Sequence, residues 1–376
     1  MISFEEKPKG AVIKVVGVGG GGGNAVANMI NAGIEGVEFI VINTDAQVLA
    51  KHQAPNKIHI GLAITKGLGA GGKPEIGQIS AIEDADLISD SLRGADIVFI
   101  TAGMGGGTGT GAAPVVASIA REIGALTIAV VTTPFYYEGR TRKENANKGL
   151  ENLKEHVDSY IVVDNDRLME VGDKNTSAQD SFRVADDVLR QGVQGISDTI
   201  NISGNINLDC ADVRSIMQSK GLALMGIGLA SGENRDKEAL EKALKGPLLA
   251  DANLKGAYGI ILNVTGGKDL KMFELGNIGK MVSEYAGEEC NIIQGFVTDE
   301  KMEGNIRIVL IATGISQKEL PKTPNLRDFI RKEKGGDEIM ENTKKVIMHN
   351  PKIPRTIEEY NNDDYETPTY LRKQVD

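Results

Sequence analysis

The chain has 376 residues, of which 41% are hydrophobic, 25% charged and 4% aromatic, and its formal net charge at pH 7 is −10. This composition is typical of a water-soluble globular protein, and the length allows two or three domains. The acidic balance and the absence of tryptophan argue against a nucleic-acid partner, which selects basic surfaces and stacking aromatic side chains.

The chain contains two cysteines and four histidines, and none of them has metal-ligand spacing. No metal site built from protein side chains is therefore expected. No signal peptide is recognised, and no apolar run approaches the length of a membrane span. These features predict a cytoplasmic protein without direct membrane insertion.

In the first half of the chain, apolar strands alternate with helices. Strands are predicted at residues 11–18, 38–43, 95–101, 126–134 and 160–164. Helices are predicted at residues 25–32, in a segment that closes near residue 93, at residues 112–124 and from about residue 141. This alternation predicts an α/β fold with a Rossmann-like, doubly wound parallel sheet over residues 11–176. Ligands of such sheets bind beyond the C-terminal ends of the strands.

A long helix is predicted over residues 177–201, where apolar residues recur at spacings of three and four. These residues are Phe182, Ala185, Leu189, Val193, Ile196 and Ile200. The helix is about twice as long as the usual ~11–12 residues. This length favours a central helix between two domains over a helix that only covers the first domain.

Residues 202–316 are predicted to form a second α/β domain with a mixed sheet. The candidate strands are residues 222–230, 259–264, 291–297 and 305–313, and the candidate helices are residues 236–245 and 270–286. Beyond residue 316, prolines and mixed charges predict a disordered linker over residues 317–364. Residues 365–376 regain apolar content, which is typical of a short peptide that a partner captures.

One glycine-rich stretch, Gly105 to Gly111, contains five glycines in seven residues between a predicted strand and a predicted helix. Glycine lets the backbone approach an anion closely, and the free amides at the start of a helix attract phosphate. Five glycines are more than a tight turn requires. The stretch is therefore predicted to form a phosphate-binding loop.

Two further stretches are glycine-rich. The segment from Gly17 to Gly22 matches the dinucleotide fingerprint, with Asp45 as a plausible ribose acceptor. The segment from Gly67 to Lys73 nearly matches a P-loop, but Pro74 replaces the Ser or Thr that would hold a metal. Three such loops at one sheet edge indicate a nucleotide with several phosphates, whereas a nicotinamide enzyme needs only the first.

These motifs resemble those of the tubulin/FtsZ superfamily, and of its FtsZ family in particular. The resemblance is carried by Gly105–Gly111, Gly17–Ala25, Asn43–Gln47, Glu138–Arg142, Asn207–Val213 and Leu371–Gln374. It runs from about residue 11 to residue 316 and resumes at the final peptide. It implies a GTPase that polymerises head to tail into the filaments of the bacterial division ring at mid-cell.

The resemblance also implies ligands and partners. The nucleotide would be GTP or GDP, and Mg²⁺ would enter with it to neutralise the phosphate oxygens. Each chain would join a homopolymer. Residues 365–376 would bind membrane-tethering and regulatory division proteins.

By resemblance, one set of residues would contact the phosphate chain: Gly20, Gly21, Gly22, Gly23, Asn24, Gly107, Thr108 and Gly109. Gly71 and Gly72 belong to the loop that would sense the third phosphate. Glu138 and Arg142 correspond to ribose contacts. The alternative for this last pair is a surface salt bridge between residues four apart on a helix, worth only ~0.3–0.5 kcal/mol.

Phe182 and Asp186 are four apart on the long helix, so they share one face. The resemblance implies that this pair stacks on guanine and reads it, because a carboxylate accepts hydrogen bonds from both the N1–H and the 2-amino group. The alternatives are a phenylalanine in the core and a solvated aspartate.

Asn207, Asp209 and Asp212 resemble the catalytic loop of the family, which serves the nucleotide of the next subunit. Two carboxylates at this spacing suit the orientation of an attacking water. The alternative for Asp212 is a helix cap. Cys210 departs from the family, which commonly has phenylalanine at this position, and the departure affects only local packing.

Three other classes of protein remain as alternatives. A Rossmann-type oxidoreductase would need only the first glycine loop. A non-hydrolysing scaffold of the tubulin type would lack the acids at positions 209 and 212. A relative that handles plasmids would lack the Leu-Arg-Lys-Gln sequence at residues 371–374.

Overall fold

The structure is a computed structural model. It describes residues 11–171, 177–201, 209–218, 221–246, 248–249, 254–287 and 289–315. The predicted linker and the predicted terminal peptide lie outside these described residues. All of the described residues belong to one compact unit. The division into domains at residues 11–176, 177–201 and 202–316 stays a prediction.

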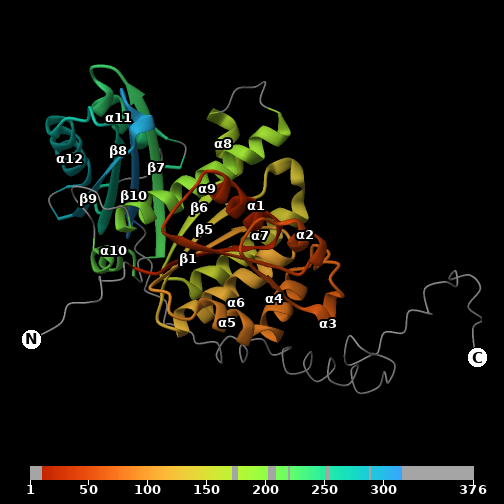
Figure 1. The fold of residues 1–376 in the computed structure, drawn as a ribbon. Coiled ribbons are helices and arrows are strands. Elements are labelled where there is room, and N and C mark those ends of the chain that lie inside the picture. Colours follow the sequence, from red (N-terminus) through yellow and green to blue (C-terminus); the bar gives the residue numbers. More distant parts are fainter. Residues whose placement is uncertain are drawn as a thin grey trace, which may run out of the picture. The chain divides into compact units, whose positions relative to one another are not determined.

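The strands form one mixed sheet in the order β3-β2-β1-β4-β5-β6-β7-β10-β8-β9 (Figure 1). They are β1 (Ile13–Val18), β2 (Val37–Asn43), β3 (Asn56–His59), β4 (Ile97–Gly103), β5 (Leu126–Thr133), β6 (Ser159–Asp164), β7 (Gly221–Ser231), β8 (Gly259–Gly266), β9 (Asn291–Thr298) and β10 (Asn305–Thr313). Strands β1 to β6 are mutually parallel, which confirms the α/β fold expected for the first half.

Helices cover both faces of the parallel strands. They are α1 (Gly19–Asn31), α2 (Ala46–Lys51), α3 (Leu62–Thr65), α4 (Pro74–Glu83), α5 (Ala85–Leu92), α6 (Thr108–Glu122), α7 (Arg140–His156) and α8 (Asn165–Val171). The remaining ones are α9 (Ala178–Asn201), α10 (Cys210–Met217), α11 (Arg235–Lys245) and α12 (Met272–Ala286). Helices α1 and α9 lie on one face, and α4 to α7 lie on the other (Figure 1).

Every residue of β1 is buried, because a parallel sheet between two helical layers has no solvent-facing side. On the face under α1 and α9, Val15 and Phe99 pack with Met29 and Val193. The long helix α9 also packs against β8, β9 and β10, so it is the central helix that the apolar spacing predicted.

The second part of the sheet continues the first part and does not stand apart from it. Strands β6 and β7 pair in parallel over three residues, from Ser159 opposite Gly221 to Ile161 opposite Ala223. Beyond them β7, β10 and β8 are antiparallel neighbours, and β9 is parallel to β8. The short parallel pairing between β6 and β7 is the seam between the two parts.

Two helices begin earlier than the sequence indicated. Helix α1 starts at Gly19 and α6 at Thr108, so much of the two glycine stretches is helical. The prediction of loops was wrong for residues 19–22 and 108–111, because it did not consider that a helix start without side chains can pack closely against neighbouring backbone. A Cβ on Gly109 would lie 2.8 Å from the carbonyl oxygen of Gly103.

The segment that closes near residue 93 is two helices. Helices α4 and α5 meet at Asp84, whose φ of −105° and ψ of 25° are not helical. The carboxylate of Asp84 accepts a hydrogen bond of 2.7 Å from the backbone N–H of Gly61. The break therefore joins the helical layer to the loop that precedes α3.

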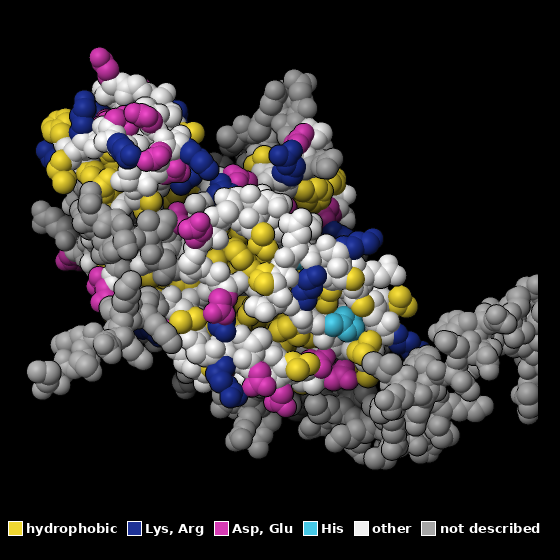
Figure 2. Space-filling view, viewed as in Figure 1, with side chains coloured by type: hydrophobic (Ala, Val, Ile, Leu, Met, Phe, Trp, Pro, Cys, Tyr) yellow, Lys and Arg dark blue, Asp and Glu magenta, His cyan; other side chains and the backbone are white. Residues whose placement is uncertain are grey.

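The face of the molecule in Figure 2 carries interspersed positive and negative side chains, and hydrophobic side chains gather over α12. Met272 and Phe273 at the start of α12 are 76% and 75% exposed. Among the described residues, no helix is long and apolar enough to cross a bilayer. The same residues contain no cluster of three or more His, Cys, Asp or Glu side chains that could hold a metal.

Candidate functional site

The starts of α1 and α6 nearly touch. Strand β1 leads directly into α1, the neighbouring strand β4 leads through a four-residue turn into α6, and both strands run in the same direction. A Cβ on Gly19 would lie 2.7 Å from the backbone nitrogen of Gly109, and a Cβ on Gly21 would lie 3.0 Å from the Cα of Gly103. The amides of two helix N-termini therefore converge at one edge of the sheet, and such an arrangement binds anions.

The glycines at this edge divide into two groups. Gly22, Gly107 and Gly109 are needed for packing, because a Cβ on each would collide with neighbouring backbone. Gly20 has no atom within 4 Å of its Cβ position and is exposed, as is Asn24. Gly23 allows ordinary contact. Some of these glycines are therefore needed for close packing, whereas others leave open space in which an anion could approach the backbone.

A third loop, residues 66–73, lies over the start of α6. A Cβ on Gly107 would lie 2.8 Å from the Cβ of Ala70 and 2.9 Å from the nitrogen of Lys73. Gly71 and Gly72 have positive φ angles of 58° and 73°, and nothing lies within 4 Å of either Cβ position. This loop therefore presents bare backbone to the space at the edge of the sheet.

Threonine hydroxyls tie this edge together. The hydroxyl groups of Thr44 and Thr108 share a buried hydrogen bond of 2.6 Å, and Thr110 Oγ1 accepts one of 2.8 Å from the N–H of Gly105. The carboxylate of Asp45 accepts hydrogen bonds from the first amides of α2, at 2.9 and 3.1 Å. Asp45 therefore caps α2 through its Oδ1 atom.

Glu138, in the 3-10 turn that follows β5, forms an ion pair with Arg142 in the first turn of α7. Glu138 Oε1 also accepts a hydrogen bond of 3.0 Å from the N–H of Phe135. The salt bridge that was the alternative for this pair is therefore present. It joins α7 to the turn after β5, beside the same edge of the sheet.

Phe182 on α9 is not a core residue, since it is 43% exposed. Its ring meets the buried ring of Phe135 edge to face, with centroids 5.1 Å apart. Asp186, one turn further along α9, is half-buried and makes no hydrogen bond or ion pair with any described residue. Burial raises the pKa of Asp186 to about 6. A half-buried, unpaired carboxylate beside an exposed aromatic ring suits the edge of a purine base.

Asp209 and Asp212 lie at the start of α10, and both are exposed. The carboxylate of Asp209 accepts a hydrogen bond of 3.2 Å from the N–H of Ala211, so Asp209 caps the helix. The capping role suggested for Asp212 therefore falls to Asp209. Asn207 lies outside the described residues.

The acids of α10 and the glycine loops lie at opposite ends of the parallel strands. Arg214 of α10 donates a hydrogen bond of 3.0 Å to the carbonyl of Asp96, directly before β4. The Gly105 turn follows the other end of β4, which is seven residues long. At about 3.3 Å per residue this strand spans roughly 23 Å. Within one chain, the carboxylates of α10 and the glycine loops are therefore separated by the length of β4.

One polar residue at the glycine edge was missed. Asn165, directly after β6, is 4% exposed, and its Oδ1 accepts no hydrogen bond from a described residue. Its neighbour Asp166 accepts a hydrogen bond of 2.8 Å from the N–H of Tyr136. The sequence signal was a run of three polar residues, Asp164 to Asp166, at the end of a strand. A buried amide oxygen without a partner needs an explanation, and a ligand at this edge would supply one.

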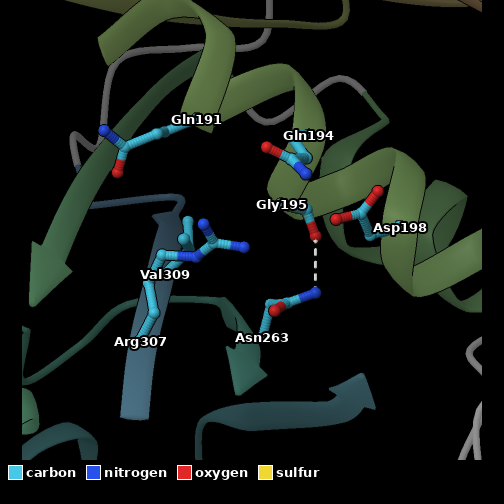
Figure 3. A pocket seen from close by; sticks show the side chains of 7 residues that line it. All are labelled: Gln191, Gln194, Gly195, Asp198, Asn263, Arg307 and Val309. Carbon is cyan, nitrogen blue, oxygen red and sulfur yellow. Dashed lines mark hydrogen bonds between the residues drawn. The ribbon is translucent and has the colours of Figure 1, made fainter. Parts of the chain in front are cut away.

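A small open pocket lies elsewhere, between α9, β8 and β10. Its lining residues are Gln191, Gln194, Gly195, Asp198, Asn263, Arg307 and Val309 (Figure 3). Asn263 Nδ2 donates a hydrogen bond of 3.1 Å to the carbonyl of Gly195 (Figure 3). Burial raises the pKa of Asp198 to about 6, although Arg307 and Arg190 act in the opposite direction. No sequence motif predicted this cavity.

Two family models match the chain. Residues 12–173 match the GTPase domain of the tubulin/FtsZ family, and residues 221–316 match the C-terminal domain of the FtsZ family. The structure is also similar to an empty FtsZ dimer from M. jannaschii, with 44% identity and a TM-score of 0.79 over 85% of this chain and 92% of that one. The chain belongs to the tubulin/FtsZ family.

Other structures of the family agree. A point variant of the M. jannaschii FtsZ is 45% identical with a TM-score of 0.79, over 84% of this chain and 94% of that one. CetZ2 from Haloferax volcanii, in a GTPγS-bound protofilament, is 19% identical over 89% and 99% of the two chains, with a TM-score of 0.67. This last likeness concerns the fold alone. A bacterial origin for this FtsZ-family chain stays a prediction.

Proposed function

We propose that the chain binds GTP, assembles head to tail into filaments and hydrolyses the nucleotide at each junction between two chains. The observation that carries this proposal is the position of the acids of α10, at the sheet edge opposite the glycine loops. Two copies stacked in the same direction bring one chain's acids to the other chain's loops. Because this contact repeats without closing, it builds a filament.

In this proposal the nucleotide lies across the glycine edge. The amides of Gly20 to Asn24 and of Gly107 to Gly109 hold the phosphate chain, and the loop at Gly71 and Gly72 meets the third phosphate. The open space at Gly20, Gly71 and Gly72 supports direct approach of phosphate oxygens. Glu138 and Arg142 hold the ribose, and their ion pair fixes the orientation of both side chains.

Phe182 stacks on guanine, and the Asp186 carboxylate accepts hydrogen bonds from its N1–H and 2-amino groups. The unpaired state of Asp186 among the described residues supports this role, since a buried polar group without a partner is costly until a ligand supplies one. Adenine offers no such pair of donors. The arrangement therefore selects guanine.

Mg²⁺ suits this edge because it prefers phosphate oxygens and water to a cage of protein ligands. Backbone amides and the Thr108 hydroxyl dominate the edge, and the described residues offer no cluster that would compete for the ion. When bound, Mg²⁺ neutralises charge on the phosphates. In the neighbouring chain, Asp209 and Asp212, together with Asn207, orient and polarise the attacking water.

The test is a mixing experiment with two inactive variants. Asp212→Ala keeps the nucleotide edge and loses an acid, whereas Asp186→Ala keeps the acids and loses base recognition. We expect Asp212→Ala to bind GTP normally and to turn it over far more slowly. A mixture of the two variants should regain partial turnover, because some junctions combine an intact edge with intact acids. If Asp212→Ala turned over GTP at the wild-type rate, shared catalysis would be refuted.

We also propose a cellular role in the division ring at mid-cell, in the cytoplasm. Residues 11–176 would be the GTP-binding domain, residues 177–201 the central helix and residues 202–316 the activating domain. Residues 317–364 would be the linker to the partner-binding peptide at residues 365–376. Deleting this peptide should leave polymerisation intact in vitro and abolish binding to membrane-tethering division proteins. Retained binding would refute the role of the peptide.

A further inference from the structure

The C-terminal end of α10 is fastened by side chains from two distant strands. The last carbonyl groups of a helix have no partner within the helix and need one from elsewhere. In α10, the carbonyl of Met217 accepts a hydrogen bond of 2.5 Å from the hydroxyl of Ser159, and the carbonyl of Ile216 accepts one of 3.0 Å from the hydroxyl of Thr313.

Both hydroxyl-bearing residues are completely buried, at 0% exposure. Water therefore cannot replace either hydroxyl if it is removed. Ile216 and Met217 are themselves buried, and the Cγ1 of Ile216 lies 3.0 Å from the Cβ position of Gly259. The end of α10 is thus held by two hydroxyls and by close packing against the start of β8.

The two hydroxyls come from opposite sides of the seam. Ser159 begins β6 and is the first residue paired with β7, whereas Thr313 ends β10 in the second part of the sheet. Direct pairing between β6 and β7 covers only three residues. Helix α10 therefore bridges the seam, and it carries Asp209 and Asp212 toward its other end, eight and five residues before Met217.

We propose that Ser159 and Thr313 are positioning residues that clamp α10 across the seam and so set the direction in which Asp209 and Asp212 face the neighbouring nucleotide. This inference rests on the proposed function. Neither hydroxyl touches the nucleotide or the acids. Both act through the helix, whose eight residues transmit a shift at Met217 to the carboxylates.

The clamp predicts a specific pattern in kinetics. Loss of one hydroxyl should reduce the turnover of assembled chains about two- to tenfold, which corresponds to the free energy that one hydrogen bond of ordinary strength contributes to holding α10 in place. GTP affinity of the single chain should not change, because the glycine edge lies at the other end of the strands. The effect should therefore fall on kcat and leave the affinity for GTP intact.

The test uses Ser159→Ala, Thr313→Val and Thr313→Ser in the full chain. Valine keeps the shape of threonine without its hydroxyl, and serine keeps the hydroxyl. We expect Thr313→Val and Ser159→Ala to lower phosphate release per sedimented chain, and Thr313→Ser to restore it. The matched control is Thr127→Val. Thr127 is equally buried, and its hydroxyl donates to the carbonyl of Ala125 and not to α10.

Three outcomes would overturn the clamp. They are wild-type turnover in a Ser159→Ala, Thr313→Val double variant that still assembles, an equal loss in Thr127→Val, and no rescue by Thr313→Ser. Should Thr313→Val fail to fold, Ser159→Ala alone decides, since the cavity it leaves is that of one oxygen atom. Full turnover in Asp212→Ala would refute the proposed function, whereas an inactive Asp212→Ala with a fully active double variant would refute only the clamp.

Discussion

The hydroxyl of Thr44, directly after β2, lies 2.6 Å from the hydroxyl of Thr108, the first residue of α6. This hydrogen bond joins two neighbouring connections at the glycine edge. We expect Thr44→Val and Thr108→Val each to lower the free energy of unfolding by about 1 kcal/mol. Only Thr108→Val should also weaken GTP binding by about tenfold, which is one hydrogen bond to a charged group. Urea denaturation without nucleotide and equilibrium GTP binding measure the two effects. Equal loss of GTP affinity in both variants would contradict a direct phosphate contact by Thr108.

Gly20 and Gly22 should respond differently to alanine. Gly20→Ala places a methyl group in open space, so we expect unchanged or slightly higher stability and at least about tenfold weaker GTP binding. Gly22→Ala drives its methyl group into the carbonyl of Thr101 and should cost about 1–3 kcal/mol of stability. The same two assays separate these outcomes. Normal GTP affinity in Gly20→Ala would remove this residue from the phosphate site.

Recognition of guanine should depend on pH. Burial raises the pKa of Asp186 to about 6, and only the ionised carboxylate accepts both hydrogen bonds from guanine. We therefore expect GTP affinity to fall as the pH drops below about 6, by up to about tenfold per pH unit. Asp186→Ala should bind GTP weakly at every pH, and Asp187→Ala, on a different face of α9, serves as the control. A flat affinity profile for the wild-type chain between pH 5 and 7.5 would exclude this role.

Asp198 should make the fold less stable as the pH rises. Its pKa is raised from 3.8 to about 6 by burial, so its contribution to stability is fully present below pH 3.8 and is lost as the pH rises through 6. Asp198→Asn should therefore raise the free energy of unfolding at pH 7.5 by about 1–3 kcal/mol and remove this pH dependence. Asp86→Asn, at an exposed position on α5, is the control. Lower stability of Asp198→Asn at pH 7.5 would contradict this expectation and would show that the negative charge of Asp198 stabilises the fold through Arg307.

The sequence predicted the longer elements well, because burial imposes a regular apolar pattern on them. Residues 305–313 were predicted as a strand with the bounds that β10 has, and the 24-residue α9 followed from six apolar positions. Strand β3 and helix α3, with four residues each, are too short to show a period. The single sheet depends on three residue pairs between β6 and β7, which no local pattern encodes.

Within the candidate site, glycine motifs indicated the right edge of the sheet but not the helical state of the glycines. Propensity disfavours glycine in helices, whereas the structure uses its missing side chain to bring α1 and α6 against neighbouring backbone. Thr44 lies within the Asn43–Gln47 motif, but no role was assigned to it, and Asn165 escaped prediction because a short polar run after a strand does not specify a function. Their place at the site follows from the parallel order of β2, β1, β4, β5 and β6.

The length of the strands between the glycine loops and α10 sets the distance between the two surfaces that would meet in a filament. If chains join as proposed, the spacing of subunits along a filament is the thickness of the folded part between these two surfaces. Neither the length of residues 317–376 nor the partner bound to them enters that spacing. Electron micrographs of filaments from the full chain and from a chain ending at residue 316 should therefore show the same axial repeat.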